Sequence, residues 1–408
     1  MNIQTIIIVG AGQAGASAVL ELRAQQYTGQ IILIGEESHL PYERPPLSKE
    51  AILNPDQCKL EILSADKLAE LEVEFIRGQA VLSIDAAQHQ LHLQDGRCLQ
   101  YDKLLLATGG SPRRLPAFDA LGKQVYTLRN LEDAHALISV LQPDRRIVLI
   151  GGGVIGLELA SSARAKGCQV TLLEQGSRLM GRSTPEILAD FLYTQHRHHG
   201  VDIRLNSQIL DCQPQADQIL IQLDQAETLL ADAVIYGIGI QPNTALAVAA
   251  GLKVDAFGAV LVNADVQSSD PDIYAAGDIA SQLRDDGVYR RVETWENANL
   301  QAAIFARHVM QVAHPKANPA WFWTDQLGVN FQFAGDMGAE EWYVRGEINP
   351  ATPNPIFILF GIRDRQIVAA ITVNAAKEMR HLKKMIQSQQ RFATDIHLDL
   401  SRELRKLL

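Results

Sequence analysis

Residues 6–15 read IIIVGAGQAG and residues 147–156 read IVLIGGGVIG, and these two stretches decide the fold. In each, a short apolar strand runs into the pattern G-x-G-x-x-G, which is followed by a helix of small residues and a second apolar strand. The units end on acidic residues, Glu36 and Glu174. One such glycine pattern is weak evidence, but two in this full context predict two Rossmann-type dinucleotide-binding units.

The three glycines of each pattern have separate tasks. The first permits a tight turn, the second lets the backbone approach a pyrophosphate, and the third allows helix and strand to pack closely. Because the helix N-terminus carries unpaired N–H groups and a partial positive charge, it attracts phosphates. Dinucleotide contacts are therefore expected at Gly10, Gly12, Gly15, Gly151, Gly153 and Gly156.

Composition bounds the class of protein. A chain of 408 residues with 47% apolar and 21% charged residues is typical of a globular protein of two or three domains. Its net charge of -10 disfavours nucleic acid and anionic membrane as partners. No uncharged apolar run reaches the roughly 18 residues that a membrane span needs. Since a core strand begins at about Gln4, we expect no targeting peptide and a cytoplasmic location.

The rest of the chain alternates strands, turns and helices. Buried strands are expected within 101–110, 231–243 and 272–280. From about Trp321 alternating aromatic segments predict an antiparallel sheet, which the basic helix at 377–386 closes. The expected fold class is α/β, with two Rossmann-like three-layer dinucleotide-binding domains and a C-terminal α+β domain.

With these residues in hand, the chain resembles the two-dinucleotide-binding flavoprotein reductases that serve ring-hydroxylating dioxygenases, a group that includes rubredoxin and putidaredoxin reductases. The motifs that carry the resemblance run along the whole chain: GAGQAG at 10–15, LPYERPPLSK at 40–49, LLLATGG at 104–110, TLRNLEDA at 127–134, VLIGGGVIGLE at 148–158, GIGIQPN at 237–243, IYAAGD at 273–278, RVETWENA at 291–298 and WFWTDQ at 321–326.

The resemblance implies a discontinuous FAD domain of about 1–109 and 240–317. An NAD domain is inserted at about 110–239, and a C-terminal reductase domain covers about 318–408. The strands that end at Gly109 and Gly239 are where the chain would cross between the two dinucleotide domains.

The resemblance also implies a set of cofactor contacts. Glu36 would accept hydrogen bonds from the adenosine ribose, and Asp278 would bind the ribityl chain. Trp295 would touch the flavin ring, with an ordinary core tryptophan as the alternative. The other expected cofactor contacts are Ala14, Arg44, Lys49, Val81, Ala107, Thr108, Gly109, Arg129, Glu293, Ile155, Gly237 and Gly239, and Glu174 is expected to bind the nicotinamide cofactor.

By the same resemblance Lys49 and Glu158 are the expected catalytic residues, paired near the flavin N5 atom. A lysine in a dry site needs a compensating carboxylate, and a cation there favours the arrival of hydride. A solvated lysine and an exposed helix acid are the alternatives. Trp323 is a candidate for the flavin edge where electrons leave, with a core role as its alternative.

Glu174 decides the nicotinamide cofactor. A carboxylate at this place binds the 2′-hydroxyl of NADH and repels the 2′-phosphate of NADPH. Arg178 and Arg182 lie close in sequence and would weaken this preference. FAD and NADH are thus the expected cofactors.

The predicted activity is that of a ferredoxin–NAD(+) reductase. Hydride passes from NADH to FAD, and single electrons pass on to a ferredoxin, expected to hold a 2Fe–2S cluster, of an aromatic-ring-hydroxylating dioxygenase. A rubredoxin or another iron–sulfur carrier is the alternative acceptor, and an NADH-sensing protein of the apoptosis-inducing-factor kind is an alternative of another class. A disulfide reductase would need a cysteine within 40–49, which has none. The protein is expected to be a monomer or homodimer.

Two further patterns are open to more than one interpretation. His196, His198 and His199 end a helix, and we interpret them as last-turn groups rather than metal ligands, so no metal site is predicted. The basic residues of the C-terminal helix form either a docking patch for an acidic ferredoxin or a solvated face. These residues are Lys377, Arg380, Lys383 and Lys384.

Overall fold

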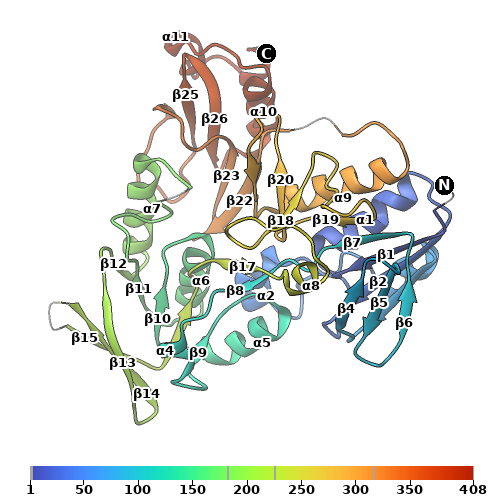
Figure 1. The fold of residues 1–408 in the computed structure, drawn as a ribbon. Coiled ribbons are helices and arrows are strands. Elements are labelled where there is room, and N and C mark those ends of the chain that lie inside the picture. The colour runs from blue at the N-terminus through green and yellow to red at the C-terminus, as the bar shows by residue number, and fades with distance from the viewer. Residues whose placement is uncertain (1–2, 182, 225–226, 316–317, 408) are drawn as a thin grey trace. The chain divides into compact units, whose positions relative to one another are not determined.

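The computed structural model describes residues 3–181, 183–224, 227–315 and 318–407. Its fold is drawn in Figure 1. The chain forms two compact units, each of which is built from three stretches of sequence. The first unit comprises Met1–Pro45, Lys59–Ser111 and Ile240–Lys316; the second comprises Pro46–Cys58, Pro112–Gly239 and Ala317–Leu408.

A parallel five-stranded sheet with strand order β19-β7-β1-β2-β3 is the centre of the first unit. Its strands are β1 (Thr5–Val9), β2 (Gln30–Gly35), β3 (Val73–Arg77), β7 (Lys103–Leu106) and β19 (Ile273–Ala275). Helices α1 (Gln13–Ala24) and α9 (Trp295–Val309) pack against each other. Because helices cover the sheet, its central strands are continuous apolar runs rather than alternating ones.

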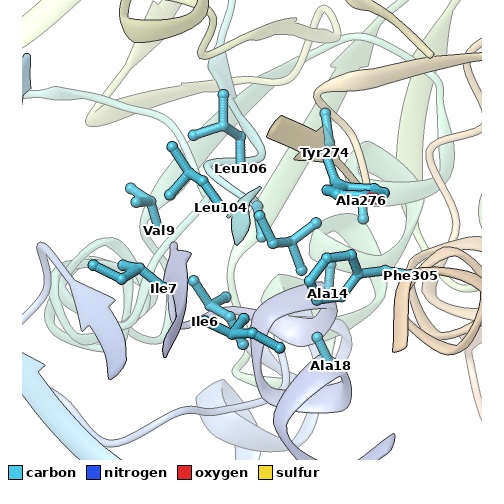
Figure 2. Close-up of a cluster of buried hydrophobic side chains, with 14 of the residues drawn as sticks. Ile6, Ile7, Val9, Ala14, Ala18, Leu104, Leu106, Tyr274, Ala276 and Phe305 are labelled. Carbon is cyan, nitrogen blue, oxygen red and sulfur yellow. The ribbon is translucent and has the colours of Figure 1, made fainter. Parts of the chain in front are cut away.

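The core of this unit lies between the sheet and the two helices. Figure 2 shows Ile6 and Leu104 from neighbouring strands beside Ala14 and Ala18 of α1, with Phe305 of α9 in the same cluster. These five side chains are at most 7% exposed. The small residues of α1 therefore let the helix lie close to the sheet, as the sequence pattern indicates.

Smaller elements complete the first unit. They are α3 (Ala65–Glu70), α8 (Ala245–Ala249), the antiparallel sheet of β4 (Val81–Asp85), β5 (Gln90–Leu93) and β6 (Cys98–Gln100), the sheet of β18 (Val260–Val262), β20 (Ala280–Leu283) and β21 (Tyr289–Arg290), and β17 (Ile240–Pro242), which pairs with β8 (Gly110–Pro112).

The second unit contains another parallel five-stranded sheet, with strand order β12-β11-β10-β16-β9. Its strands are β9 (Val125–Tyr126), β10 (Arg146–Ile150), β11 (Gln169–Leu173), β12 (Val201–Arg204) and β16 (Ala233–Tyr236). Around it lie α2 (Glu50–Leu53), α4 (Pro116–Asp119), α5 (Leu131–Val140), α6 (Val154–Ala165) and α7 (Glu186–His198), with a small sheet of β13 (Ile209–Gln215), β14 (Gln218–Leu223) and β15 (Thr228–Ala231).

An antiparallel sheet with strand order β22-β23-β26-β25-β24 forms the C-terminal part of the second unit. Its strands are β22 (Trp321–Gln326), β23 (Val329–Gly335), β24 (Glu341–Gly346), β25 (Phe357–Arg363) and β26 (Gln366–Val373), and α10 (Met379–Gln387) and α11 (Thr394–His397) follow. The fold class expected from the sequence, two parallel α/β sheets and a C-terminal α+β part, is confirmed. Among the described residues no helix is both long and apolar enough to cross a membrane.

Candidate active site

The first glycine pattern is shaped by close backbone contacts. Gly10 has φ +112°, and a Cβ built on it would lie 2.2 Å from the carbonyl oxygen of Ala107. A Cβ on Gly15 would lie 1.9 Å from the carbonyl oxygen of Gly10. Gly12 differs, because a Cβ there meets no protein atom within 4 Å. The first and third glycines thus serve the fold, and the second leaves the backbone open to a ligand.

The second pattern repeats this geometry. Gly151 has φ +107°, and its Cβ would lie 2.4 Å from the carbonyl oxygen of Gly237. A Cβ on Gly156 would lie 2.0 Å from the carbonyl oxygen of Gly151, whereas Gly153 again meets nothing within 4 Å. We call these two loops, 10–15 and 151–156, the glycine cradles.

Both cradles end at a helix whose N-terminus is open. Helices α1 and α6 start after Gly12 and Gly153, and neither has a side-chain cap or an acidic residue in its first turn. By contrast, Asn130 and Asp133 form a complete capping box on α5. The first-turn N–H groups of α1 and α6 are therefore free of local carboxylates and fit the pyrophosphate of a dinucleotide.

Glu174 lies directly beside the second cradle. Its carboxylate accepts hydrogen bonds from the backbone N–H groups of Gly152 and Gly176, both at 2.6 Å. The guanidinium of Arg178 donates to the carbonyl oxygen of Gly181 at 3.0 Å. Arg182 lies outside the described residues. The acid is thus held at the end of β11, where a ribose would approach the cradle.

The acid of the first unit has a neighbour that the sequence analysis missed. Glu36 is exposed directly after β2, while Glu37 accepts hydrogen bonds from Arg44 at 2.6 Å and from the Tyr42 hydroxyl at 2.5 Å. Arg44, an expected cofactor contact, is therefore held by a carboxylate next to Glu36. The sequence could have indicated the role of Glu37, because two adjacent acidic residues, Glu36 and Glu37, follow the strand.

The other expected contacts of the first unit are distributed over several elements. Ala14 lies against Gly277, whose Cβ would be 3.2 Å from that of Ala14, and Ala107 lies beside Gly10. Thr108 donates to the carbonyl oxygen of Asn243 at 2.7 Å. The remaining positions are Gly109 with φ +64°, Val81 at the start of β4, Asp278 after Gly277, Glu293 paired with Arg291 at 2.5 Å, and Trp295 at the first position of α9.

In the second unit, Gly237 lies against Gly151 of the cradle, and Gly239 accepts a backbone hydrogen bond from Arg113 at 2.9 Å. Ile155, in the first turn of α6, is 41% exposed. Arg129 precedes α5, where its backbone N–H donates to Asp133 at 2.8 Å.

The structure brings together the two residues expected to be catalytic. Lys49 Nζ lies 3.1 Å from Glu158 Oε1, and Glu158 is only 2% exposed. The buried carboxylate also accepts hydrogen bonds from the hydroxyls of Ser48 and of Thr324, the latter at 2.7 Å. A second acid, Asp325, lies 3.3 Å from Lys49 Nζ. We call these five residues the charge cluster. The positive charge of its lysine is compensated by two carboxylates, and its buried carboxylate accepts several hydrogen bonds, as a buried ion pair requires.

Sequence reasoning missed three members of the charge cluster. Ser48 was part of the quoted motif at 40–49, and Thr324 and Asp325 follow Trp323 in WFWTDQ. Side chains at 48–49, 158 and 324–325 converge because α2, α6 and β22 meet within the second unit. In the sequence, only the resemblance carried by the ordered motifs indicated that Lys49 and Glu158 lie together.

A row of aromatic rings leads away from the charge cluster. Lys49 Nζ lies 5.8 Å from the ring centroid of Trp323, which stacks on Trp321 with centroids 5.1 Å apart. Lys383 of α10 lies over the other ring, with Nζ 4.4 Å from the centroid of Trp321. The basic helix and the charge cluster are thus linked by two stacked indoles.

The histidines at the end of α7 have different environments. His196 is fully buried, and one ring nitrogen lies 3.0 Å from the side-chain oxygen of Gln326. His198 and His199 are exposed at the helix end. His196 lies in the last turn of α7, as interpreted, but its side chain is buried in the core. Burial lowers its pKa from 6.5 to about 4, and the hydrogen bond with Gln326 opposes this shift.

We expect His196 to make the stability of the protein depend on pH. The unfolded chain binds a proton as the pH falls below about 6.5, whereas the folded histidine stays neutral until about pH 4. The contribution of neutral His196 to the free energy of unfolding is therefore complete above pH 6.5 and declines towards pH 4. Between pH 7 and pH 5 the free energy of unfolding should fall by about 2 kcal/mol through this group. Urea titrations of wild type and His196→Gln at both pH values measure the difference.

His198→Gln is the matched control for this prediction, because it removes an exposed histidine from the same helix. It should keep the wild-type pH dependence. If His196→Gln and His198→Gln respond to pH alike, the buried histidine is not the cause.

The four cysteines of the chain are all free thiols. Burial raises the pKa of Cys58, Cys168 and Cys212, and Glu50 adds to the rise at Cys58. These three are therefore protonated and weakly nucleophilic at neutral pH. Such an arrangement does not support a redox disulfide.

Two glycine cradles on two parallel sheets define a protein that binds two dinucleotides. The chain belongs to the pyridine nucleotide-disulphide oxidoreductase family, whose model matches residues 4–302. A second family model, the reductase C-terminal domain, matches residues 321–408.

Known relatives match along nearly the full length. The chain is 44% identical over 387 residues to the 3-phenylpropionate/cinnamic acid dioxygenase ferredoxin–NAD(+) reductase component of Photorhabdus laumondii, covering 95% of this chain and 97% of that protein. The reductase in the covalent putidaredoxin reductase–putidaredoxin complex is 33% identical, with a TM-score of 0.92 over 99% of this chain and 98% of that one. The ferredoxin reductase for the CYP199A2 system of Rhodopseudomonas palustris is 31% identical, with a TM-score of 0.92 over 99% of both chains.

Proposed function

We propose that this protein is an NADH-dependent flavoprotein reductase that supplies electrons to the ferredoxin of an aromatic-ring-hydroxylating dioxygenase. The observation that carries the proposal is the pair of glycine cradles, each open at its second glycine and at the helix end that follows. The relative from Photorhabdus, which is a reductase component of a dioxygenase, supports the choice of reaction.

The two cofactors divide between the two cradles. FAD would be held by the cradle at 10–15 with Glu36, and NADH by the cradle at 151–156 with Glu174. When bound, FAD supplies the ability to take up a hydride and release single electrons, which nicotinamide alone lacks. We also propose a cytoplasmic location, which free thiols favour.

The charge cluster is proposed to act on the hydride-transfer step. Its lysine carries a positive charge whose cost is offset by Glu158 and Asp325, so that the charge persists in a mostly buried place. A fixed cation stabilises negative charge that develops nearby during hydride transfer, without reorganising water. Ser48 and Thr324 hold the Glu158 carboxylate and thereby position Lys49.

The ferredoxin is proposed to dock near the basic helix α10. The overall charge of -10 repels an acidic carrier, so attraction depends on a local basic group of side chains. Lys383 joins this helix to the stacked indoles of Trp321 and Trp323, which lead to the charge cluster. We propose a 2Fe–2S ferredoxin as the carrier, with rubredoxin as the second candidate.

Anaerobic stopped-flow spectroscopy tests the proposed function. The FAD-loaded protein is mixed with NADH or NADPH, and the reduced protein is then mixed with oxidised ferredoxins and rubredoxin. Rapid bleaching by NADH and rapid reoxidation by a 2Fe–2S ferredoxin are the expected results. Slow bleaching with a long-lived charge-transfer band would contradict the reductase function and favour an NADH sensor.

Replacing Glu174 with glutamine should narrow the preference for NADH over NADPH. The amide keeps an acceptor for the Gly152 N–H group but removes the charge that repels a 2′-phosphate. We expect the ratio of kcat/KM for the two cofactors to fall by at least about tenfold, which corresponds to about 1.4 kcal/mol. Steady-state kinetics with both cofactors measure the ratio.

Glu186→Gln is the control for this change, since Glu186 is an exposed acid of the same unit at the start of α7. It should leave the ratio unchanged. An unaltered ratio in Glu174→Gln would show that another group selects the nicotinamide cofactor.

A further inference from the structure

We propose that Asp265, His308 and His314 of the first unit form a binding site for one Zn²⁺ ion. Their ligand atoms all lie within 4.8 Å of one another. Asp265 Oδ1 lies 3.5 Å from His308 Nδ1 and 3.3 Å from His314 Nε2. Ligands about 2.0–2.1 Å from a tetrahedral zinc ion lie roughly 3.3–3.4 Å apart. The two distances from Asp265 already fit this spacing, and the two imidazoles, whose ligand atoms lie within 4.8 Å, would close on the ion by side-chain movement.

His308 is held by the core of the unit. It lies in the last turn of α9, and its ring packs on Tyr274 with centroids 5.8 Å apart. Tyr274 is 1% exposed and packs edge-on against Phe305, and both side chains are labelled in Figure 2. A rigid aromatic support on one side of the imidazole limits its rotation and keeps Nδ1 near Asp265.

The end of α9 brings His314 back to His308. Gln311 has φ +56°, and its N–H group donates to the His308 carbonyl oxygen at 3.0 Å. The N–H group of Val312 donates to the Arg307 carbonyl oxygen at 2.8 Å. These two bonds form a Schellman motif, which reverses the chain directly after the helix. Two histidines six residues apart thereby come to face the same carboxylate.

The third ligand lies on a tight turn between β18 and β19. Asn263 Oδ1 accepts hydrogen bonds from the N–H groups of Asp265 at 2.9 Å and of Gln267 at 3.0 Å. Val266, the next residue, is fully buried and has φ +57°. The backbone on both sides of the Asp265 carboxylate is thus fixed.

The chemistry of the three side chains fits zinc. Two imidazoles and one carboxylate are common zinc ligands, and they leave a fourth position for water. The side chains of Asp265, His308 and His314 are 35%, 32% and 34% exposed, so an ion can enter from solvent. A bound ion would cross-link the turn before β19 to the end of α9 and thereby stabilise the folded state of the first unit.

The experiment uses the full-length, FAD-loaded protein and Zn²⁺ with a competing chelator in calorimetry. We expect one ion per chain in the wild type. His308→Gln, His314→Gln and Asp265→Asn should each weaken binding by at least about tenfold. His89→Gln is the matched control, because His89 Nε2 lies 3.3 Å from Asp272 Oδ2 in the same unit, and among the residues that the structure describes no second histidine completes that pair. It should bind zinc as the wild type does.

Crystals of the wild type soaked with Zn²⁺ provide a second test, which requires no substituted protein. An anomalous signal at the zinc edge within bonding distance of Asp265, His308 and His314 would establish the site. An ion elsewhere, or equal affinity in the wild type and in the three ligand variants, would overturn it. The zinc site does not depend on the proposed function. Ligand variants that lose zinc binding but keep NADH-dependent flavin reduction would separate the two.

Discussion

A protein with alanine in place of Gly12 should fold as the wild type does but bind FAD about a hundredfold more weakly. Gly12 has φ -82°, which alanine adopts easily, and a Cβ at this position meets no protein atom within 4 Å. The methyl group therefore occupies only the space through which the pyrophosphate approaches the backbone. A hundredfold loss corresponds to about 2.7 kcal/mol. Titration of the apoprotein with FAD, followed by flavin fluorescence, measures the affinity.

Gly153→Ala is a matched control in the second unit, because its Cβ also meets nothing within 4 Å. It should leave FAD binding intact and weaken NADH binding instead. Gly15→Ala is the contrasting case, since its Cβ would lie 1.9 Å from a backbone oxygen and the fold itself should suffer. If Gly12→Ala binds FAD normally, or if Gly12→Ala and Gly153→Ala weaken the same cofactor, the assignment of the two cradles is wrong.

The second large effect is expected at the charge cluster. Glu158→Gln should slow the reduction of bound FAD by NADH about a hundredfold, a typical loss when one preorganised electrostatic group is removed. Glutamine keeps the shape of the side chain and one acceptor oxygen, so either Ser48 or Thr324, which donate to different oxygens of Glu158, can keep its hydrogen bond to that oxygen. It removes the buried charge, so that Lys49 is left with Asp325, whose side chain is 44% exposed. Anaerobic stopped-flow measurements at saturating NADH give the rate.

Asp325→Asn is the control for this variant, because it removes the exposed acid and leaves Glu158 in place. We expect its rate to fall far less than that of Glu158→Gln, because the buried carboxylate still offsets the charge of Lys49. A purely structural role of Glu158 would lower the melting temperature of Glu158→Gln without changing the reduction rate. That result, or an equally slow Asp325→Asn, would contradict the proposed role of the pair.

The sequence predicted those parts of the fold that depend on local pattern. The glycine cradles could be recognised because their glycines stand at a fixed short spacing between an apolar strand and a helix. The contacts that require the first glycine of each cradle, with Ala107 and Gly237, lie far along the chain and could not be seen in the sequence. The continuous apolar strands and the alternating C-terminal segments likewise carry their own periodicity. Lys49 and Glu158, which are 109 residues apart, were paired only through the resemblance to known reductases.

The parts that sequence reasoning missed depend on contacts between distant elements. Thr324 and Asp325 reach the charge cluster because β22 meets α6, and no local pattern of WFWTDQ indicates this. His196 was correctly placed in the last turn of its helix, but its burial was not foreseen, because that helix end looks polar in sequence. Asp265 and His308 meet only after β19 and α9 have packed, so a metal site there could not be read from spacing.

The protonated thiols have a consequence for how this protein responds to oxidants. Hydrogen peroxide attacks thiolates far faster than thiols. Since burial raises the pKa of Cys58, Cys168 and Cys212, little thiolate is present at neutral pH. These three thiols are therefore expected to oxidise slowly.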